Sequence, residues 1–129
     1  MNCPSDRLYH REHLWVQQGE GEELSIGVTD YAQEQLGQVV FVECLKPGTE
    51  LRQGVSFGTI ESAKTASELI APVSGFVKAI NEKLQQEPWL VNEDPYGQGW
   101  ILKLVPSNIE EFKELLDSRA YHRLLLGAG

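Results

Sequence analysis

The sequence predicts a mainly β protein with a single domain, residues 1–129, and short helices at its periphery and C-terminus. Between residues 13 and 104, short apolar runs alternate with Gly, Pro, Asn and Asp, and no linker or low-complexity segment interrupts them. Nearer the C-terminus, apolar residues recur at helical spacing instead. With 41% hydrophobic residues, the 129-residue chain can fill one modest core without oligomerisation, so we expect a monomer.

The first predicted element is a β-hairpin made of residues 14–16 and 24–28. Both runs contain the apolar and β-branched residues that strands favour, and the acidic segment 19–23, with two glycines, lies between them. We interpret the glutamates of this segment as a solvated turn.

A short helix over residues 31–36 follows the hairpin. Thr29 or Asp30 can cap its N-terminus, because a short polar side chain there accepts a hydrogen bond from a free backbone N–H group. Gly37 can end the helix in the left-handed conformation that other residues avoid. The apolar run 39–42 then predicts a strand.

Residues 54–75 predict a second hairpin with a polar centre. The apolar segments 55–60 and 69–73 flank the small and polar residues 61–68. Lys64 falls near the middle, where its side chain would project into solvent and its small neighbours would leave it accessible to an enzyme. Two further strands are predicted over residues 75–80 and 100–105. A Gly- and Asn-containing loop over residues 92–99 lies between them.

The C-terminal segment predicts a helix that begins near residue 108. Ser107 and Glu110 form a capping-box pattern at this point. We assign the apolar stripe that follows to packing on the sheet; its residues are Ile109, Phe112, Leu115 and Leu116. The pattern predicts a break at 117–118 and a second helical stretch over 121–126.

The chain is acidic, because 19 Asp and Glu residues against 11 Lys and Arg residues give a formal charge of −8. This charge repels nucleic acid and anionic membrane surfaces, so we expect neither as a partner. The first residues contain neither an apolar signal core nor a transit pattern, which predicts a cytoplasmic protein. Cys3 and Cys44 form no C-x-x-C pair, so we expect reduced thiols and neither a disulfide framework nor a thiolate metal site.

The residues around Lys64 form a motif, although a lysine on an exposed turn is usually only a solvated charge. Glu61 precedes Lys64 by three residues, and Ala71-Pro72-Val73-Ser74-Gly75 follows it. This pattern resembles the lipoyl-attachment motif of the glycine-cleavage H-protein family. The resemblance extends over about residues 8 to 126, and its other matching segments are Tyr9, His13-x-Trp15, Ile26-Gly27-Val28-Thr29-Asp30, Ala32-Gln33, Leu36-Gly37, Val40-Phe41-Val42-Glu43, Leu90-Val91-Asn92, Pro95-Tyr96, Gly99-Trp100 and Leu115-Leu116.

The resemblance implies a hybrid antiparallel β-sandwich, the barrel-sandwich hybrid of lipoyl domains, with Lys64 on a hairpin turn. It implies lipoate as the cofactor, bound covalently to Lys64 as N6-lipoyl-lysine. The chain would then be a non-catalytic carrier in a multienzyme system, because the dithiolane supplies the chemistry and the protein supplies orientation and recognition. Proteins of this family shuttle an aminomethyl group between enzymes on a swinging arm.

The resemblance also implies partner enzymes. A lipoate-protein ligase or lipoyltransferase would attach the cofactor, and glycine decarboxylase, aminomethyltransferase and dihydrolipoyl dehydrogenase would use it. We expect ligase and partner recognition near the attachment turn, at Glu61, Ser62, Glu68 and Gly75. Glu61 is the stronger candidate for a docking charge.

Three residues are expected in the cleft that holds the loaded arm, namely His13, Leu14 and Gln35. Family members generally have a glutamate at the position of Leu14 and often a histidine at that of Gln35. Leucine offers only apolar contact to a cationic aminomethyl group, so two hypotheses about the cargo stay open. One is an ordinary glycine-cleavage carrier. The other is an H-like lipoate-binding protein that carries sulfur intermediates for a heterodisulfide-reductase-like complex.

Other classes of site are less favoured. Biotin carriers usually flank the attachment lysine with methionines, whereas Ala63 and Thr65 flank Lys64. A metal or catalytic site built on His10, Glu12 and His13 is disfavoured, because on an extended strand residues 10 and 13 point to opposite faces and only residues 10 and 12 share one. An unmodified interaction module stays open, and an intact-mass measurement would distinguish it from a lipoylated carrier.

Overall fold

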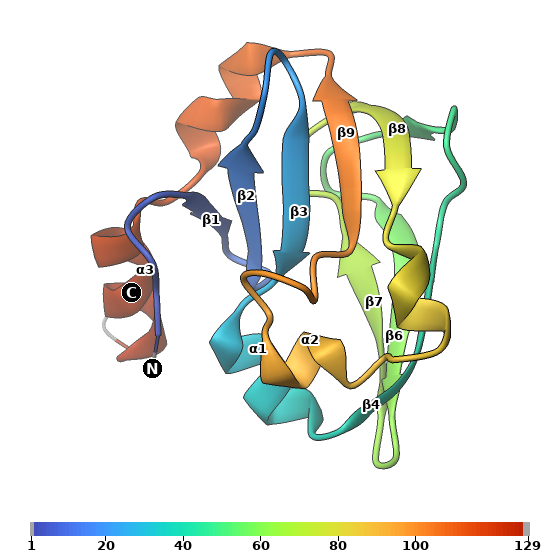
Figure 1. Ribbon diagram of the computed structural model, residues 1–129. Coiled ribbons are helices and arrows are strands. Elements are labelled where there is room, and N and C mark those ends of the chain that lie inside the picture. Colours follow the sequence, from blue (N-terminus) through green and yellow to red (C-terminus); the bar gives the residue numbers. More distant parts are fainter. Residues whose placement is uncertain (1, 128–129) are drawn as a thin grey trace.

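The computed structural model describes residues 2–127 and contains two antiparallel sheets (Figure 1). The larger sheet has the strand order β1-β2-β3-β9-β8-β5, and the smaller sheet has the order β4-β6-β7. The strands are β1 (Leu8–His10), β2 (Leu14–Gln18), β3 (Leu24–Val28), β4 (Val39–Cys44), β5 (Glu50–Leu51), β6 (Ser56–Ser62), β7 (Ala66–Ile70), β8 (Gly75–Ile80) and β9 (Leu102–Pro106). The predicted fold class, mainly β with antiparallel sheets and short helices, is confirmed.

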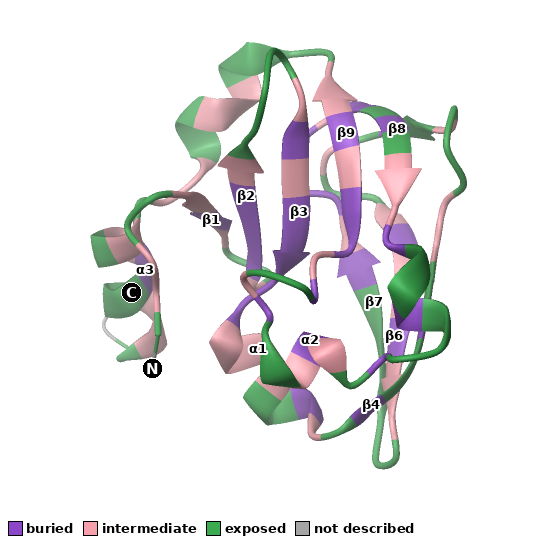
Figure 2. Ribbon diagram, in the orientation of Figure 1, coloured by how far each residue is buried: buried purple, intermediate pink, exposed green. Residues whose placement is uncertain are grey.

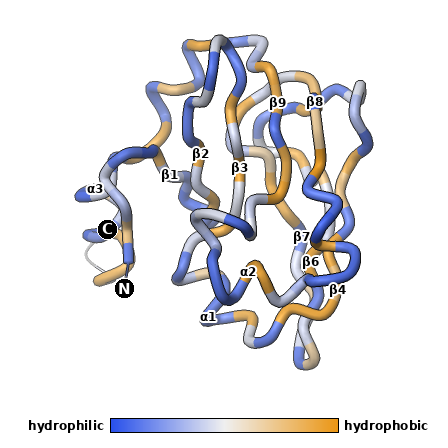
Figure 3. Tube along the Cα trace, in the orientation of Figure 1, coloured by the Kyte–Doolittle hydropathy of each residue, from blue (hydrophilic) through white to orange (hydrophobic). Residues whose placement is uncertain are grey.

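One apolar core contains side chains from both sheets. In β3, all residues except Ser25 are buried, and Ile26 pairs with Leu102 of β9. Ile60 and Leu69 of the small sheet belong to the same buried cluster. Figure 3 shows both hydrophobic and hydrophilic residues in the strands, as expected where one face of a sheet meets the core and the other meets solvent.

The hairpin of β6 and β7 projects beyond the rest of the molecule, and its tip is exposed (Figures 1 and 2). Ile60 and Leu69, each 2% exposed, hold its base in the core. The hairpin was predicted, but the range of its second strand was wrong, since β7 covers residues 66–70 and not 69–73. Ala71 still makes backbone hydrogen bonds to Gly54 and Val55, but Pro72 has no N–H group to donate, so the pairing ends there although residues 71–73 are buried.

Within residues 2–127, five short helical segments lie around the sheets: α1 (Asp30–Leu36), the 3-10 helix η1 (Glu82–Gln85), α2 (Leu90–Glu93), the 3-10 helix η2 (Ile109–Glu114) and α3 (Ser118–Leu125). Thr29 caps α1, because its side chain accepts the N–H of Ala32. Gly37 ends α1 at φ 81° and ψ −162°, a region that glycine occupies readily. The Thr29 cap and the Gly37 terminus are therefore confirmed, but the ψ of Gly37 places it outside the left-handed helical conformation that the sequence predicted.

Helices α1 and α2 contact each other beside the small sheet, and α3 packs against β1 near both chain termini (Figure 1). The predicted loop 92–99 is wrong at its start, because residues 92 and 93 belong to α2. Within residues 2–127, no helix is long and apolar enough to cross a membrane.

The C-terminal prediction is correct in outline and wrong in detail. The cap of η2 is Asn108 and not Ser107, since the Asn108 side chain accepts the N–H of Glu110 at 3.1 Å. Ile109 is 70% exposed and does not pack on the sheet. Phe112 does contact the core. A break is present, but it covers residues 115–117, and α3 begins at residue 118 and not at residue 121.

Candidate functional site

Lys64 occupies the tip of the β6–β7 hairpin. The turn is closed by a backbone hydrogen bond of 2.8 Å from the Ser62 N–H to the Thr65 carbonyl oxygen. The Ser62 hydroxyl oxygen also accepts the N–H groups of Lys64, at 3.3 Å, and Thr65, at 3.2 Å. One serine side chain therefore shapes the backbone on which Lys64 is presented.

The stem of Lys64 lies against the end of α1. A Cβ atom at Gly37 would be 3.4 Å from Lys64 Cε. Asn92 holds this end of α1 in place, since its amide donates to the Gly37 carbonyl and its side-chain oxygen accepts the Val39 N–H, both at 2.8 Å. The outer part of the Lys64 side chain, from Cδ to Nζ, thus lies beside a surface that hydrogen bonds hold in place. The sequence prediction did not assign Asn92 to the site.

A cleft of about 390 Å³ begins at the residue after Lys64 and is termed the hairpin cleft. Its walls come from the turn before β2, from α1 and from β7. The three residues expected in the arm cleft, His13, Leu14 and Gln35, all line it. Glu12 and Glu68 line it too.

The hairpin cleft has an apolar floor and an acidic rim. Leu14 is 2% exposed and belongs to the main core, so it contributes to the floor. Glu12, Gln35 and Glu68 are exposed. No lysine or arginine is among the described residues that line the cleft. Glu12 is therefore an acidic group that the sequence considered only as part of a metal site.

Two residues assigned to recognition are less accessible than Glu68. Glu61 is half-buried in β6, where it pairs with Phe41 of β4 and Ala66 of β7. Gly75 is buried in β8, and a Cβ atom there would collide with the Val105 carbonyl oxygen. Direct contact between Gly75 and an enzyme is therefore excluded by its burial. Its role is to let β8 and β9 approach closely.

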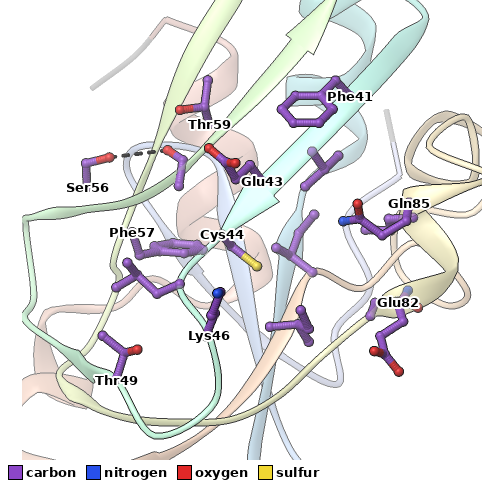
Figure 4. Close-up of a pocket in the computed structure, with 17 residues that line it drawn as sticks. Phe41, Glu43, Cys44, Lys46, Thr49, Ser56, Phe57, Thr59, Glu82 and Gln85 are labelled. Carbon is purple, nitrogen blue, oxygen red and sulfur yellow. Dashed lines mark hydrogen bonds between the residues drawn. The ribbon is translucent and has the colours of Figure 1, made fainter.

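A larger cleft, of about 830 Å³, lies between β4 and η1 and does not include Lys64 (Figure 4). Figure 4 shows Cys44 on one side and Gln85 of η1 on the other. Burial, with a smaller contribution from Glu43, raises the pKa of the Cys44 thiol to about 11. A thiol with so high a pKa is a poor nucleophile at neutral pH, so this cleft lacks the reactive group that the hairpin tip has.

The histidines near β1 have few potential metal ligands beside them in the described residues. In the part of the chain from residue 2 to 127, no three His, Cys, Asp or Glu side chains are grouped as metal ligands. His13 lies in the turn before β2 with φ 68°, and its Nδ1 is 2.8 Å from the Tyr121 hydroxyl. Cys3 and Cys44 are both free thiols.

Comparison with known proteins identifies one family over almost the whole length of the chain. Residues 7–127 match the family described as "Glycine cleavage H-protein". The chain belongs to this family. The glycine cleavage system H protein of Symbiobacterium thermophilum is 51% identical over 120 residues, which is 93% of each chain. That of Oceanobacillus iheyensis is 47% identical and covers 97% of this chain and 98% of the relative. A crystal structure of a glycine cleavage system H protein from Mycobacterium marinum aligns with TM-score 0.85 and 35% identity, over 96% and 98% of the two chains.

Membership of the glycine cleavage H-protein family confirms the resemblance seen in the sequence. Proteins of this family carry lipoate covalently on a lysine, so this H-protein is a lipoyl carrier and lipoate is its cofactor. Its relatives support the glycine-cleavage hypothesis and not the sulfur-carrying alternative.

Proposed function

We propose that Lys64 is the lysine that carries lipoate. The observation that supports this most is its place at the exposed tip of the projecting hairpin, directly before the hairpin cleft. Among the described residues, no carboxylate is within ion-pairing distance of Lys64 Nζ. Other lysines are engaged, since Lys78 and Lys103 pair with Glu23 at 2.8 and 3.6 Å.

The residues around Lys64 fit an amide-linked lipoyl group. The neighbours Ala63 and Thr65 are small and exposed, so a ligase can reach the amine. Gly37 leaves room beside the Lys64 stem, and the hairpin cleft offers the arm a resting place. When bound, lipoate supplies the redox and group-transfer chemistry through its dithiolane. The protein shapes the turn through Ser62 and lines the resting place.

We further propose that the cargo is a cationic aminomethyl group. Glu12 and Glu68 put two acidic side chains on the rim of the hairpin cleft, and no lysine or arginine opposes them among the described lining residues. Opposite charges attract across such a cleft, whereas a sulfur-bearing cargo without an amine would gain nothing from the carboxylates. Glu12 thus offers the charge that Leu14 cannot.

We infer that the chain catalyses no step itself and passes its cargo among partner enzymes in the cytoplasm. These are a lipoate-protein ligase or lipoyltransferase, glycine decarboxylase, aminomethyltransferase and dihydrolipoyl dehydrogenase. Glu61 and Glu68, on either side of Lys64, are the proposed docking charges. Tethering helps because a docked carrier presents its reactive group at high effective concentration.

Lipoylation mapping tests the attachment site. The chain is co-expressed with a competent lipoate ligase, and intact mass and peptide mapping locate the added group. We expect one lipoyl group on Lys64, none in Lys64→Arg and full modification in Lys46→Arg. Lys46 is the matched control, because it is also exposed and has no carboxylate partner among the described residues. Lipoate found mainly on another lysine would overturn the assignment.

A further inference from the structure

The hydroxyl group of Tyr121 joins three elements behind the hairpin cleft. It lies 2.8 Å from His13 Nδ1 and 2.7 Å from Thr29 Oγ1. Tyr121 belongs to α3, Thr29 caps α1, and His13 lies in the turn before β2 and lines the cleft. Tyr121 and Thr29 are both 0% exposed, so each buried hydroxyl proton needs an acceptor in the protein.

The direction of these hydrogen bonds follows from Thr29. Its hydroxyl oxygen accepts the backbone N–H of Ala32 at 3.2 Å. Among the described residues, the Tyr121 oxygen is the acceptor within hydrogen-bonding distance of the Thr29 hydroxyl. Thr29 therefore donates to Tyr121, and Tyr121 in turn donates its own proton to His13 Nδ1. A ring nitrogen that accepts a hydrogen bond carries no proton.

We propose that Thr29 and Tyr121 are positioning residues that fix His13 as a neutral imidazole with its proton on Nε2. In residues 2–127, no buried side-chain nitrogen or oxygen lacks a partner, and Nε2 makes no protein hydrogen bond there, so it is accessible. An N–H donor is thus available on a residue that lines the hairpin cleft. The inference rests on the proposed function, because the arm on Lys64 is what this donor would meet.

The neutral state of His13 matters because the cleft is acidic. Glu12 and Glu68 favour a cationic imidazole, and His10 opposes one. A second proton on Nδ1 would reverse the hydrogen bonds and leave the buried Thr29 hydroxyl proton without an acceptor. Burial also favours the neutral imidazole, because it lowers the pKa of His13.

Two aromatic rings also lie beside His13. The Tyr31 ring of α1 packs against the imidazole with ring centroids 4.6 Å apart, and the Tyr121 ring lies 5.8 Å away. A neutral His13 therefore offers the arm a donor for a carbonyl oxygen or a sulfur atom without adding a positive charge. A cationic His13 would repel a cationic cargo and weaken the attraction of Glu12 and Glu68.

Nitrogen-15 NMR of the histidine rings in the whole, unmodified protein tests the proposal. Long-range proton–nitrogen correlation spectra distinguish a protonated ring nitrogen from an unprotonated one, and loss of a signal in His13→Gln assigns His13. At neutral pH we expect His13 to show an unprotonated Nδ1 and a protonated Nε2. The opposite tautomer, or a doubly protonated ring, would overturn the proposal without any variant of Tyr121.

A pair of tyrosine variants supplies the matched control. Tyr121→Phe removes the donor to Nδ1 but keeps the ring that stacks on Tyr9 at 4.7 Å. Tyr9→Phe removes an equally buried hydroxyl, which donates to the Pro4 carbonyl and does not touch His13. We expect the pKa of His13 to rise and its tautomer preference to weaken in Tyr121→Phe alone. No change there, or equal changes in both variants, would contradict the proposal.

The consequence for the arm is measured separately. Lipoylation of the wild type should shift the His13 Nε2–H signal, and Tyr121→Phe should reduce this shift. If mass spectrometry found no lipoate on Lys64, the proposed function would fail, yet the tautomer of the unmodified protein would still decide the positioning role. If lipoate were attached and the Nε2–H signal did not move, the role toward the arm would be overturned.

Discussion

The attachment hairpin and the aromatic cluster under α3 are built in opposite ways. At the hairpin tip, Ala63, Lys64 and Thr65 are exposed, and a single serine holds the turn. The aromatic cluster consists of Tyr9, Trp15 and Tyr121, each no more than 1% exposed. The reactive amine thus lies where substitution disturbs little packing, whereas the side chains that position the cleft are part of a core. Function and stability should separate at the hairpin and stay linked in the aromatic cluster.

Lys64→Arg should separate the two properties most completely. A guanidinium cannot form the lipoyl amide, so lipoylation and carrier activity should be lost entirely. Stability should change by no more than about 0.5 kcal/mol, as for other exposed positions. Intact mass, a glycine-cleavage assay with heterologous partners and a urea unfolding curve measure these quantities. A large loss of stability, or activity that persists, would contradict the separation of function from stability at the hairpin tip.

Trp15→Ala tests the opposite region. The Trp15 ring is 1% exposed, donates from Nε1 to the Pro95 carbonyl at 3.0 Å and has the Arg7 guanidinium 4.7 Å from its centroid. Its loss should cost about 3–5 kcal/mol of unfolding free energy. Trp89→Ala is the control, because Trp89 is 39% exposed. Similar losses in the two variants, measured by urea unfolding, would contradict the importance given to the buried cluster.

The local patterns in the sequence were enough to predict much of the fold. The β6–β7 hairpin, the Thr29 cap and the Gly37 terminus all depend on neighbouring residues, and all three are present. Strands β1 and β5 were missed, because they have only three and two residues, and β5 pairs with β8, which is distant in sequence. Ser107 was preferred to Asn108 since both side chains can cap a helix, and only the backbone decides between them.

The candidate site also contains residues that the sequence indicated and residues that only the fold brings together. Lys64 was recognisable because its motif is contiguous, and the resemblance to a family indicated His13, Leu14 and Gln35. Glu12 was not assigned to the cleft, since it faces groups from α1 and β7 that only the fold brings near it. Tyr121 looked like one more apolar position of a C-terminal helix. Its hydrogen-bond partners Thr29 and His13 lie 92 and 108 positions earlier in the chain, so no local pattern predicts these contacts.

Removing charge from the cleft rim should give an intermediate effect. In the lipoylated protein, Glu12→Gln and Glu68→Gln should each speed spontaneous release of an aminomethyl cargo about two- to five-fold, the range typical of exposed charge pairs. Glu22→Gln is the matched control, because it removes an exposed glutamate in the turn at the other end of the β2–β3 hairpin. The assay loads each protein with glycine and a heterologous decarboxylase and follows release over time.

Salt should reduce the difference between the cleft variants and wild type, since it screens exposed charges. Release that is equally fast in wild type and in the Glu12→Gln/Glu68→Gln double variant would show that the rim charges do not hold the cargo. An equal change in Glu22→Gln would indicate an effect of net charge and not of the cleft.

Ser62→Ala should have the smallest effect, because it alters the shape of the turn without touching the reactive amine. The Ser62 hydroxyl accepts two backbone N–H groups, and their loss should loosen the turn. Both groups can bond to water at this exposed tip, so stability should fall by less than about 1 kcal/mol. Lipoylation should slow several-fold yet still reach completion, since the ligase must then select the correct turn from a broader ensemble. Ser62→Thr keeps the hydroxyl and should restore the rate, which time-resolved intact mass measures together with hydrogen exchange at the Thr65 amide. A slow Ser62→Thr with normal Thr65 protection would instead mean that the ligase reads the serine itself, and the hairpin tip would then be a recognition surface as well as a support for Lys64.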